Sequence, residues 1–261
     1  MAGIITLTTD FGLQDAYVGI MKGVILGISP QVQLVDLSHQ IPPQDVVTGA
    51  FVLHNAYRFF PAQTVHVVVV DPGVGSSRRA IVVDTSHGQF VGPDNGIFSL
   101  IYEKEFVNQI VEIQNPQLIM PKVSKTFHGR DIFAPVAAHL WQETPLDTFG
   151  PSVSDPVALD FWKIKTSETM IQGQIAYIDQ FGNGIITLSR EQIEEKGKEF
   201  RIEVAGRVFK QVYQIYEDAK KGEALLLYGS HDKLEISVNG GNAEKILGIR
   251  KGDEVRVIYK R

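Results

Sequence analysis

The chain contains no cysteine among its 261 residues. A disulfide framework, a thiolate nucleophile and a cysteine-based zinc site are therefore excluded. A basic excess is also missing, because the formal net charge is -5 at pH 7. Proteins that bind nucleic acids are usually basic, so we expect no nucleic-acid partner.

Long apolar runs are absent as well. The most apolar early stretch, residues 16–28, is interrupted by Lys22 and is too short to span a bilayer. The first six residues lack the basic start and apolar core of a signal peptide. We therefore expect a cytoplasmic protein with no membrane partner.

The first 150 residues alternate between short apolar runs and longer segments with helical spacing. The runs predict strands at residues 4–7, 32–37, 65–70, 80–83 and 89–91, and the spacing predicts helices at residues 17–28, 45–59 and 132–141. Strands interleaved with helices are typical of a mostly parallel α/β sheet that is covered on both faces. We assign residues 1–150 to an α/β domain.

The character of the sequence changes after this domain. Residues 151–168 are interpreted as a linker. Residues 169–261 contain short apolar runs separated by turn signals such as Gly182-Asn183-Gly184 and Asn239-Gly240-Gly241. This pattern predicts a second domain that is an antiparallel β-barrel.

Three segments place a carboxylate and glycines directly after predicted strands. They are Thr8-Thr9-Asp10-Phe11-Gly12, Asp71-Pro72-Gly73-Val74-Gly75 and Gly92-Pro93-Asp94-Asn95-Gly96. Ligands of open α/β sheets bind beyond the carboxyl ends of the strands, and glycine lets the backbone approach a ligand. Any one of these segments could be a simple turn, but three at corresponding sheet ends favour a ligand site.

Common cofactor and metal motifs do not fit this chain. Asp10-Phe11-Gly12 and His128-Gly129-Arg130-Asp131 stand in the reverse of the kinase order. Gly73-Val74-Gly75 lacks the third glycine of a dinucleotide fingerprint, and no histidine pair has metal-ligand helical spacing. We predict no cofactor and no metal, although a site built from scattered His and Asp residues stays open as a minor alternative.

Taken in order along the chain, the segments resemble the S-adenosyl-L-methionine (SAM) hydroxide adenosyltransferases, which are relatives of the fluorinase and chlorinase enzymes. The matching pieces are the three segments above, Arg78, Phe127-His128-Gly129-Arg130-Asp131, Asp179-Gln180-Phe181-Gly182-Asn183, Ser230 and Asn239. The resemblance implies an α/β domain followed by a β-barrel. It also implies hydrolysis of SAM to adenosine and methionine by a homotrimer whose sites lie at the subunit interfaces.

The resemblance assigns roles to individual residues. The implied catalytic residues are Asp71, Arg78 and His128. The implied substrate-binding residues are Asp10 for the ribose hydroxyls, Phe181 and Asn183 for the adenine, Asp179 and Ser230 for the methionine end, and Asn239 as part of the pocket lining. His231 and Val238 stand where relatives have arginines, which leaves the binding of the methionine end less defined.

The chemistry requires a nucleophile that water does not readily provide. Bulk water has a pKa of about 15.7, so hydroxide is scarce at neutral pH. Arg78 is a permanent cation that stabilises an adjacent anion, and His128 can donate or accept a proton near neutral pH. Asp71 can orient either partner or accept the proton itself. Which residue accepts the proton stays open at this point.

Three other functions are compatible with parts of this pattern. In a SAM halogenase, chloride or fluoride attacks the same carbon, but a halide needs no deprotonation and would make the cluster superfluous. A second alternative is a protein that binds SAM or adenosine without turnover. A third, nucleic-acid binding by the barrel, lacks an evident basic and aromatic face.

Overall fold

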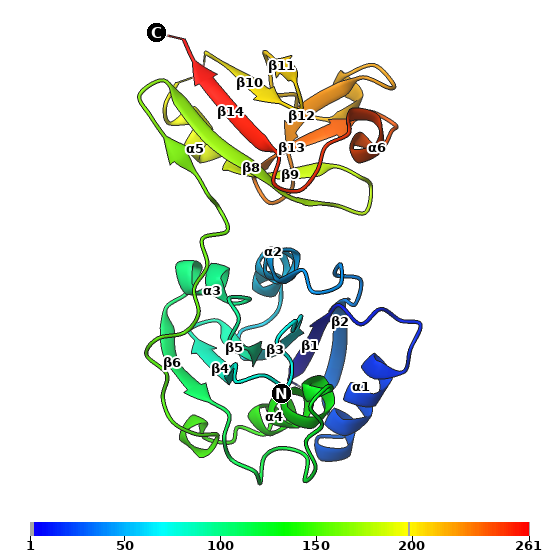
Figure 1. The fold of residues 1–261 in the computed structure, drawn as a ribbon, viewed down its shortest axis with the longest axis vertical. Coiled ribbons are helices and arrows are strands. Elements are labelled where there is room, and N and C mark those ends of the chain that lie inside the picture. Colours follow the sequence, from blue (N-terminus) through cyan, green and yellow to red (C-terminus); the bar gives the residue numbers. More distant parts are fainter. Residues whose placement is uncertain (1–2, 198, 261) are drawn as a thin grey trace. The chain divides into compact units, whose positions relative to one another are not determined.

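The computed structural model describes residues 3–197 and 199–260, which form two compact units. The first unit ends at Leu159 and the second begins at Asp160, inside the predicted linker. The first unit has hydrophobic cores on both faces of its sheet, and the second unit has a separate core. Figure 1 shows the sheet with helices in the first unit and the mostly β second unit.

The first unit is built on a six-stranded sheet with the order β2-β1-β3-β5-β4-β6. Its elements are β1 (Ile4–Thr9), α1 (Tyr17–Ile28), β2 (Gln33–Ser38), α2 (Val46–Ala56), β3 (Thr64–Val69), β4 (Ala80–Thr85), β5 (Gly88–Pro93), α3 (Ser99–Lys104), β6 (Val107–Glu112) and α4 (Ala134–Trp141). Strands β1, β2, β3 and β5 are parallel, which confirms the mostly parallel α/β prediction.

Strand β4 runs antiparallel to both of its neighbours. Only residues 86 and 87 separate β4 from β5, and such a short connection permits a hairpin but no parallel crossover. The sequence analysis did not predict α3 or β6. Both are short, so their apolar residues show too few repeats to reveal a period.

Strand β3 is buried on both faces. Val65 and Val67 pack into one core together with residues of α1 and α4, whereas Val68 and Val70 belong to another core with residues of α2 and α3. In Figure 1, the two helix pairs lie on opposite faces of the sheet. A nearly continuous apolar run is what a strand covered on both faces requires.

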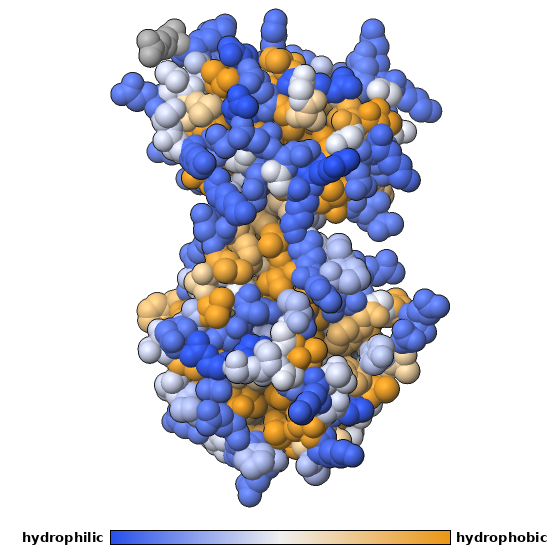
Figure 2. All heavy atoms as spheres, in the orientation of Figure 1, coloured by the Kyte–Doolittle hydropathy of each residue, from blue (hydrophilic) through white to orange (hydrophobic). Residues whose placement is uncertain are grey.

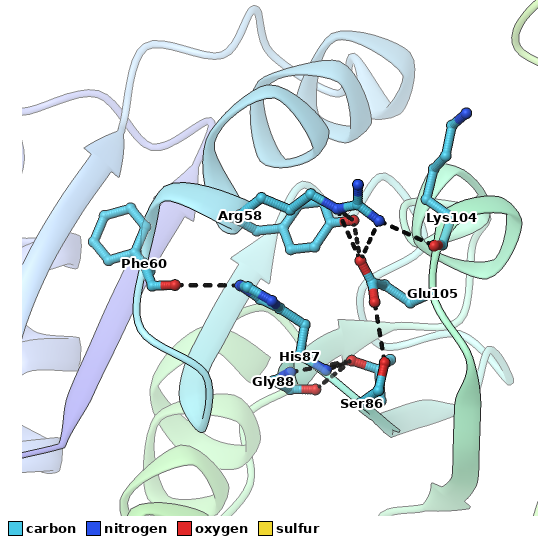
Figure 3. A network of polar contacts seen from close by, with 9 residues as sticks. Arg58, Phe60, Ser86, His87, Gly88, Lys104 and Glu105 are labelled. Atoms are coloured by element: carbon cyan, nitrogen blue, oxygen red, sulfur yellow. Dashed lines mark hydrogen bonds and ion pairs between the residues drawn. The ribbon is translucent and has the colours of Figure 1, made fainter.

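A polar network ties the end of α2 to neighbouring segments (Figure 3). Glu105 Oε1 accepts hydrogen bonds from Tyr57 Oη at 2.6 Å and from Arg58 Nη2 at 2.8 Å. His87 Nε2 lies 3.2 Å from the Phe60 carbonyl oxygen. Burial, followed by the hydrogen bond to Glu105, raises the pKa of Tyr57 to about 12, so its hydroxyl remains a donor.

The second unit is an antiparallel, nearly closed and barrel-like sheet with the order β11-β10-β14-β8-β9-β13-β12, and β7 also pairs with β8. Its elements are β7 (Lys165–Thr166), β8 (Met170–Ile178), β9 (Gly184–Ser189), α5 (Arg190–Glu194), β10 (Phe200–Val204), β11 (Arg207–Phe209), β12 (Ala224–Tyr228), β13 (Lys233–Val238), α6 (Ala243–Leu247) and β14 (Glu254–Tyr259). The predicted barrel class is confirmed.

Apolar side chains are concentrated inside the two units. Ile5, Leu7 and Ile186, for example, are fully buried. The visible surface of each unit carries mostly hydrophilic side chains, with apolar ones between them (Figure 2). Among the described residues, we find no helix with both the length and the apolar character that crossing a bilayer requires.

Candidate active site

Strand register brings two of the predicted site residues to one edge of the first sheet. Thr9 of β1 lies opposite Val69 of β3. Asp10 and Asp71 follow these two residues closely, so both lie beyond the carboxyl ends of adjacent parallel strands. This is the edge at which open α/β sheets bind ligands.

Asp71 and Arg78 form a buried ion pair at this edge. Arg78 Nε lies 3.0 Å from each carboxylate oxygen of Asp71, and Arg78 Nη2 donates to Oδ2. The side chains of Arg78 and Asp71 are only 10% and 4% exposed. The guanidinium also lies over the ring of Phe133, with 5.3 Å between Arg78 Cζ and the ring centroid. A forked pair of this kind fixes the plane of the guanidinium before any ligand arrives.

Arg78 also contacts His128, and this contact fixes the state of the imidazole. Arg78 Nη2 lies 2.6 Å from His128 Nδ1. Because a guanidinium can only donate, Nδ1 must accept, and the ring hydrogen lies on Nε2. Burial, followed by the positive charge of Arg78, lowers the pKa of His128 from its ordinary value. His128 is therefore a neutral ring at pH 7 whose Nε2–H is a donor.

A glycine allows these distant segments to meet. Gly75 has φ of +77°, and a Cβ there would overlap the backbone oxygen of Lys125. The loop of residues 71–78 therefore packs directly against the segment that leads into His128. Directly after His128, residues Gly129–Phe133 form a single π-helical turn. Such turns are rare in proteins, and those that occur often lie at functional sites.

The Asp10 segment adjoins the same region. The Phe11 and Phe127 rings pack edge to face, with 5.9 Å between their centroids, and Phe127 directly precedes His128. Asp10 Oδ2 accepts a hydrogen bond of 2.8 Å from the backbone N–H of Gln44. The structure therefore brings Asp10, Asp71, Arg78 and His128 to one region of the first unit.

The third polar segment, residues 92–96, supports the site rather than presenting a free carboxylate. Asp94 is 5% exposed. Its carboxylate accepts from Arg79 Nε and from the backbone N–H of Val157, each at 2.8 Å. Asn95 Nδ2 donates to the Val70 carbonyl oxygen at 2.9 Å, directly ahead of Asp71. Asp94 therefore holds the chain that leaves the unit, and Asn95 holds the end of β3.

A hollow of about 750 Å³ lies away from this region of the first unit. Its lining includes residues at the starts of β3 and β5, such as Thr64 and Gly88, together with His87 and Trp141. None of the four site residues lines it. The candidate chemistry therefore does not coincide with this hollow.

In the second unit, Asp179 organises a tight loop after β8. Asp179 Oδ1 accepts from the backbone N–H groups of Phe181 at 2.9 Å and Asn183 at 2.8 Å, and Oδ2 accepts from Asn183 Nδ2 at 3.1 Å. Gly182, with φ of +86°, allows the turn. The loop leaves the Phe181 side chain 75% exposed. Asn183 is buried, so the loop presents an aromatic ring on a rigid support.

The other predicted residues of the second unit have different surroundings. Ser230 is exposed in the turn between β12 and β13. The neighbouring His231 has a buried Nε2 without a hydrogen-bond partner among the described residues, and burial lowers its pKa. Asn239 Nδ2 donates to the Ala219 carbonyl oxygen at 2.8 Å, so this amide has a structural partner.

Sequence reasoning missed two side chains beside these residues. Phe133 lies beneath Arg78 because of the π turn, and a pattern read with a period of 3.6 residues cannot reveal this. Glu235 is buried on β13, where its Oε1 accepts from Tyr216 Oη at 2.8 Å and Ser237 Oγ at 2.6 Å. Burial raises the pKa of Glu235. The alternation of Leu234, Ile236 and Val238 into the core places Glu235 on the other face of β13, so the sequence pattern gave no signal of its burial.

The described residues contain no group of three or more His, Asp or Glu side chains arranged to hold a metal ion. Polar groups of the site instead bond to one another, as in the Asp71, Arg78 and His128 chain. The arrangement can stabilise an anion near Arg78 and Nε2 of His128.

Two family models match the chain. Residues 5–150 match the SAM hydroxide adenosyltransferase N-terminal domain, and residues 173–256 match the corresponding C-terminal domain. The two matches together cover most of the sequence, in the same order as the two structural units.

Curated proteins and solved structures are similar over 74% or more of this chain. A protein from Salinispora tropica named (R)-S-adenosyl-L-methionine hydrolase is 38% identical, with 97% of each chain covered. A protein from an Actinoplanes species named fluorinase is 29% identical, with 74% of each chain covered. A crystal structure of an uncharacterized conserved protein from Thermotoga maritima has a TM-score of 0.90 at 38% identity, covering 97% of this chain and 99% of that one.

Proposed function

This chain belongs to the SAM hydroxide adenosyltransferase family, and we propose that it hydrolyses SAM to adenosine and L-methionine. The observation that carries the proposal is the buried Asp71, Arg78 and His128 chain at the ligand-binding edge of the sheet. The protein from Salinispora tropica that is named (R)-S-adenosyl-L-methionine hydrolase is similar over 97% of each chain, and its name supports the same reaction.

The reaction replaces one bond at the ribose 5′ carbon by another. An oxygen derived from water forms a bond to C5′, and the bond from C5′ to the sulfonium breaks with its electron pair going to sulfur. Methionine leaves as a neutral thioether, so the leaving group needs no proton. One proton of water is released overall, and the site must therefore favour hydroxide over water.

The first unit supplies two positively polarised donors for that hydroxide. We assign the permanent charge of Arg78 and the Nε2–H of neutral His128 to this role. Preorganised donors in a water-poor site stabilise a developing or scarce anion far more than they would in water. Asp71 holds the guanidinium in place through both of its oxygens. Asp10 binds the ribose hydroxyls, since a carboxylate accepts from two neighbouring hydroxyls.

The second unit supplies contacts for the rest of the substrate. The exposed ring of Phe181 is suited to stack on adenine, beside Asn183. Asp179 and the exposed Ser230 are assigned to the methionine end, and the stretch around Asn239 lines the pocket. We further propose that the protein is a cytoplasmic homotrimer, in which the first unit of one subunit and the second unit of another form each site.

The names of the relatives add a stereochemical expectation. Proteins named (R)-S-adenosyl-L-methionine hydrolase from Salinispora tropica and Methanocaldococcus jannaschii carry a configuration in that name. We propose the same preference here, for the R configuration at the sulfonium. A site that holds both the ribose and the methionine end fixes which face of sulfur each occupies, and this provides a physical basis for the preference.

The alternative reaction is halogenation at the same carbon. The Actinoplanes fluorinase is less similar and is matched over a smaller share of the chain than the named hydrolase. A halide requires neither deprotonation nor a neutral histidine donor. The Asp71, Arg78 and His128 chain therefore favours hydrolysis.

The decisive experiment is product analysis in ¹⁸O-labelled water. Purified protein is incubated with each sulfonium diastereomer of SAM, with chloride or fluoride in one arm and a chelator in another. We expect adenosine with ¹⁸O in its 5′-hydroxyl, together with unlabelled methionine, from the R diastereomer in every arm. Halide-dependent 5′-halo-adenosine would instead identify a halogenase, and binding without products would identify a non-catalytic SAM-binding protein.

A further inference from the structure

The connection between β2 and α2, residues 39–45, holds the Asp10 segment at three points. The backbone oxygen of His39 accepts from the N–H of Gly12 at 2.7 Å. The N–H of Gln44 donates to Asp10 Oδ2 at 2.8 Å. His39 Nδ1 lies 2.8 Å from Thr9 Oγ1, in a ring that is only 4% exposed. Asp10 is therefore held on both sides and at its carboxylate by a single loop.

The ring of His39 is oriented by charges on its far side. His39 Nε2 lies 3.0 Å from Asp36 Oδ1. Asp36 Oδ2 in turn lies 2.6 Å from Lys22 Nζ. A nitrogen that faces a carboxylate carries the ring hydrogen, and in the neutral ring Nδ1 is then an acceptor for the hydroxyl of Thr9.

Thr9 passes this orientation to the residue after Asp10. With its hydrogen directed to His39, Thr9 Oγ1 has lone pairs free, and it accepts from the backbone N–H of Phe11 at 3.2 Å. The chain of contacts runs from Lys22 through Asp36 and His39 to the two residues that flank Asp10. It determines the backbone direction at the position from which the Asp10 carboxylate projects.

Gln44 gives independent evidence that this loop is constrained. Its φ is +65°, in the left-handed region that residues other than glycine, asparagine and aspartate rarely adopt. Such a conformation persists only where the surroundings require it, and it is common at ligand sites. Here it directs the N–H of Gln44 to Asp10 Oδ2. One oxygen of Asp10 is thereby fixed, and the carboxylate keeps further lone pairs for a ligand.

We propose that His39 is a positioning residue that aims Asp10 and thereby sets the requirement for a ribose 2′-hydroxyl. This inference rests on the proposed function, because it takes Asp10 as the ribose-binding carboxylate. A site built to bind a hydroxyl discriminates strongly against an analogue without it, but only while its carboxylate is correctly placed. Loss of His39 should therefore remove the discrimination against ligands that lack the 2′-hydroxyl, while the protein still binds adenosine weakly.

A second histidine that contacts a threonine of β1 offers a matched control. His66 Nδ1 also lies 2.8 Å from a threonine hydroxyl of β1, that of Thr6, and His66 is fully buried. Among the described residues, His66 contacts Thr6 and the rings of Tyr57, Phe60 and Phe90, and none of these belongs to the Asp10 segment. His66→Ala therefore removes an equivalent contact to β1 without releasing Asp10.

The test compares the affinities of adenosine and 2′-deoxyadenosine by calorimetry, which needs no turnover. For the wild type we expect adenosine to bind at least about a hundredfold more tightly. His39→Ala and Thr9→Val should reduce this ratio to less than about tenfold, mainly by weakening adenosine binding. His66→Ala and Thr9→Ser should retain the ratio. Thr9→Val keeps the shape of the side chain, so it covers the case in which His39→Ala does not fold.

Two results would overturn the proposal: a folded His39→Ala or Thr9→Val protein with the wild-type ratio, or an equal loss in His66→Ala. The proposed function fails in a different way, because wild-type protein would then yield no labelled adenosine from SAM whatever the affinity ratio. In turnover, we expect His39→Ala to raise the KM for SAM about tenfold while kcat changes less, a split typical of lost substrate binding.

Discussion

The two units hold their candidate site residues in opposite ways. In the first unit, Asp71 and Arg78 are buried and bonded to each other and to His128. In the second unit, Phe181 and Ser230 are exposed, and only the support beneath Phe181 is rigid. Groups that stabilise charge must be fixed and dry before the substrate arrives, because reorganising them would cost much of their effect. Groups that bind the outer parts of a substrate can instead be exposed to solvent before the substrate binds.

This contrast predicts which substitutions affect the chemical step and which affect binding. Changes in the buried chain of Asp71, Arg78 and His128 should lower kcat, since its proposed role is to act on the nucleophile. Changes at the exposed ring should raise KM, since the role proposed for this ring is to contact adenine in both the ground state and the transition state. The following predictions run from the largest expected effect to the smallest.

Arg78→Ala should have the largest effect. Removing one preorganised donor from an anion-stabilising site typically lowers kcat about 10²–10³-fold. Arg78→Lys should recover only part of this loss, because an ammonium cannot reproduce the fork on Asp71. Steady-state adenosine release, measured with saturating SAM on folded protein, checks the prediction.

The adjacent Arg79 provides the control for this experiment. Arg79 binds Asp94 and Asp155 rather than His128. Arg79→Ala should therefore keep kcat within a few fold of the wild type. If Arg79→Ala and Arg78→Ala lost kcat equally, the buried chain would have no special role in the chemical step.

Much of the fold could be predicted from the sequence because its elements carry strong periodic patterns. Helix α1 spans the predicted residues 17–28, and the apolar run of β3 predicted a strand covered on both faces. The antiparallel placement of β4 escaped prediction, because a short apolar run does not reveal its direction. Strand pairing depends on contacts between segments that are distant in the sequence.

The site was predictable only in part, and for the same reason. Strand ends alone indicated that Asp10 and Asp71 share an edge, which the register confirms. They indicated equally that Asp94 would face a ligand, whereas Asp94 binds the N–H of Val157, 63 positions along the chain. The contact between Arg78 and His128 joins residues 50 positions apart. Only the resemblance to a family predicted that these two belong together.

Phe181→Ala should have an intermediate effect. Stacking of an aromatic side chain on a base contributes about 1–3 kcal/mol, so KM for SAM should rise about tenfold or more with little change in kcat. Phe181→Trp should restore affinity, since it keeps a ring in place. Kinetics over a wide range of SAM concentrations separate the two parameters, and a fall in kcat at unchanged KM would contradict the assigned role.

Complementation between two inactive variants tests whether two subunits share each site. Mixing and reassembling Arg78→Ala chains with chains altered at both Asp179 and Phe181 should restore about a quarter of the sites in a randomly mixed homotrimer. A restored site takes its first unit from one chain and its second unit from the other. Mixtures that remain inactive after verified subunit exchange would place the complete site within one chain.

The smallest effect concerns the titration of His128, and it tests whether Arg78 keeps this ring neutral. Burial and the charge of Arg78 lower its pKa below the ordinary value of about 6.5. The folded state therefore binds fewer protons than the unfolded state, so this group's stabilising contribution is full above pH 6.5 and falls as pH drops toward the lowered pKa.

In Arg78→Gln, the midpoint of the His128 Cε1–H shift in NMR spectra should rise by about half a unit or more, because a neighbouring positive charge is lost. Arg79→Gln should leave the midpoint unchanged. A midpoint at or above 6.5 in the wild type would mean that His128 is largely protonated at mildly acidic pH, and the donor would then be an imidazolium rather than the neutral ring that the contact with Arg78 requires.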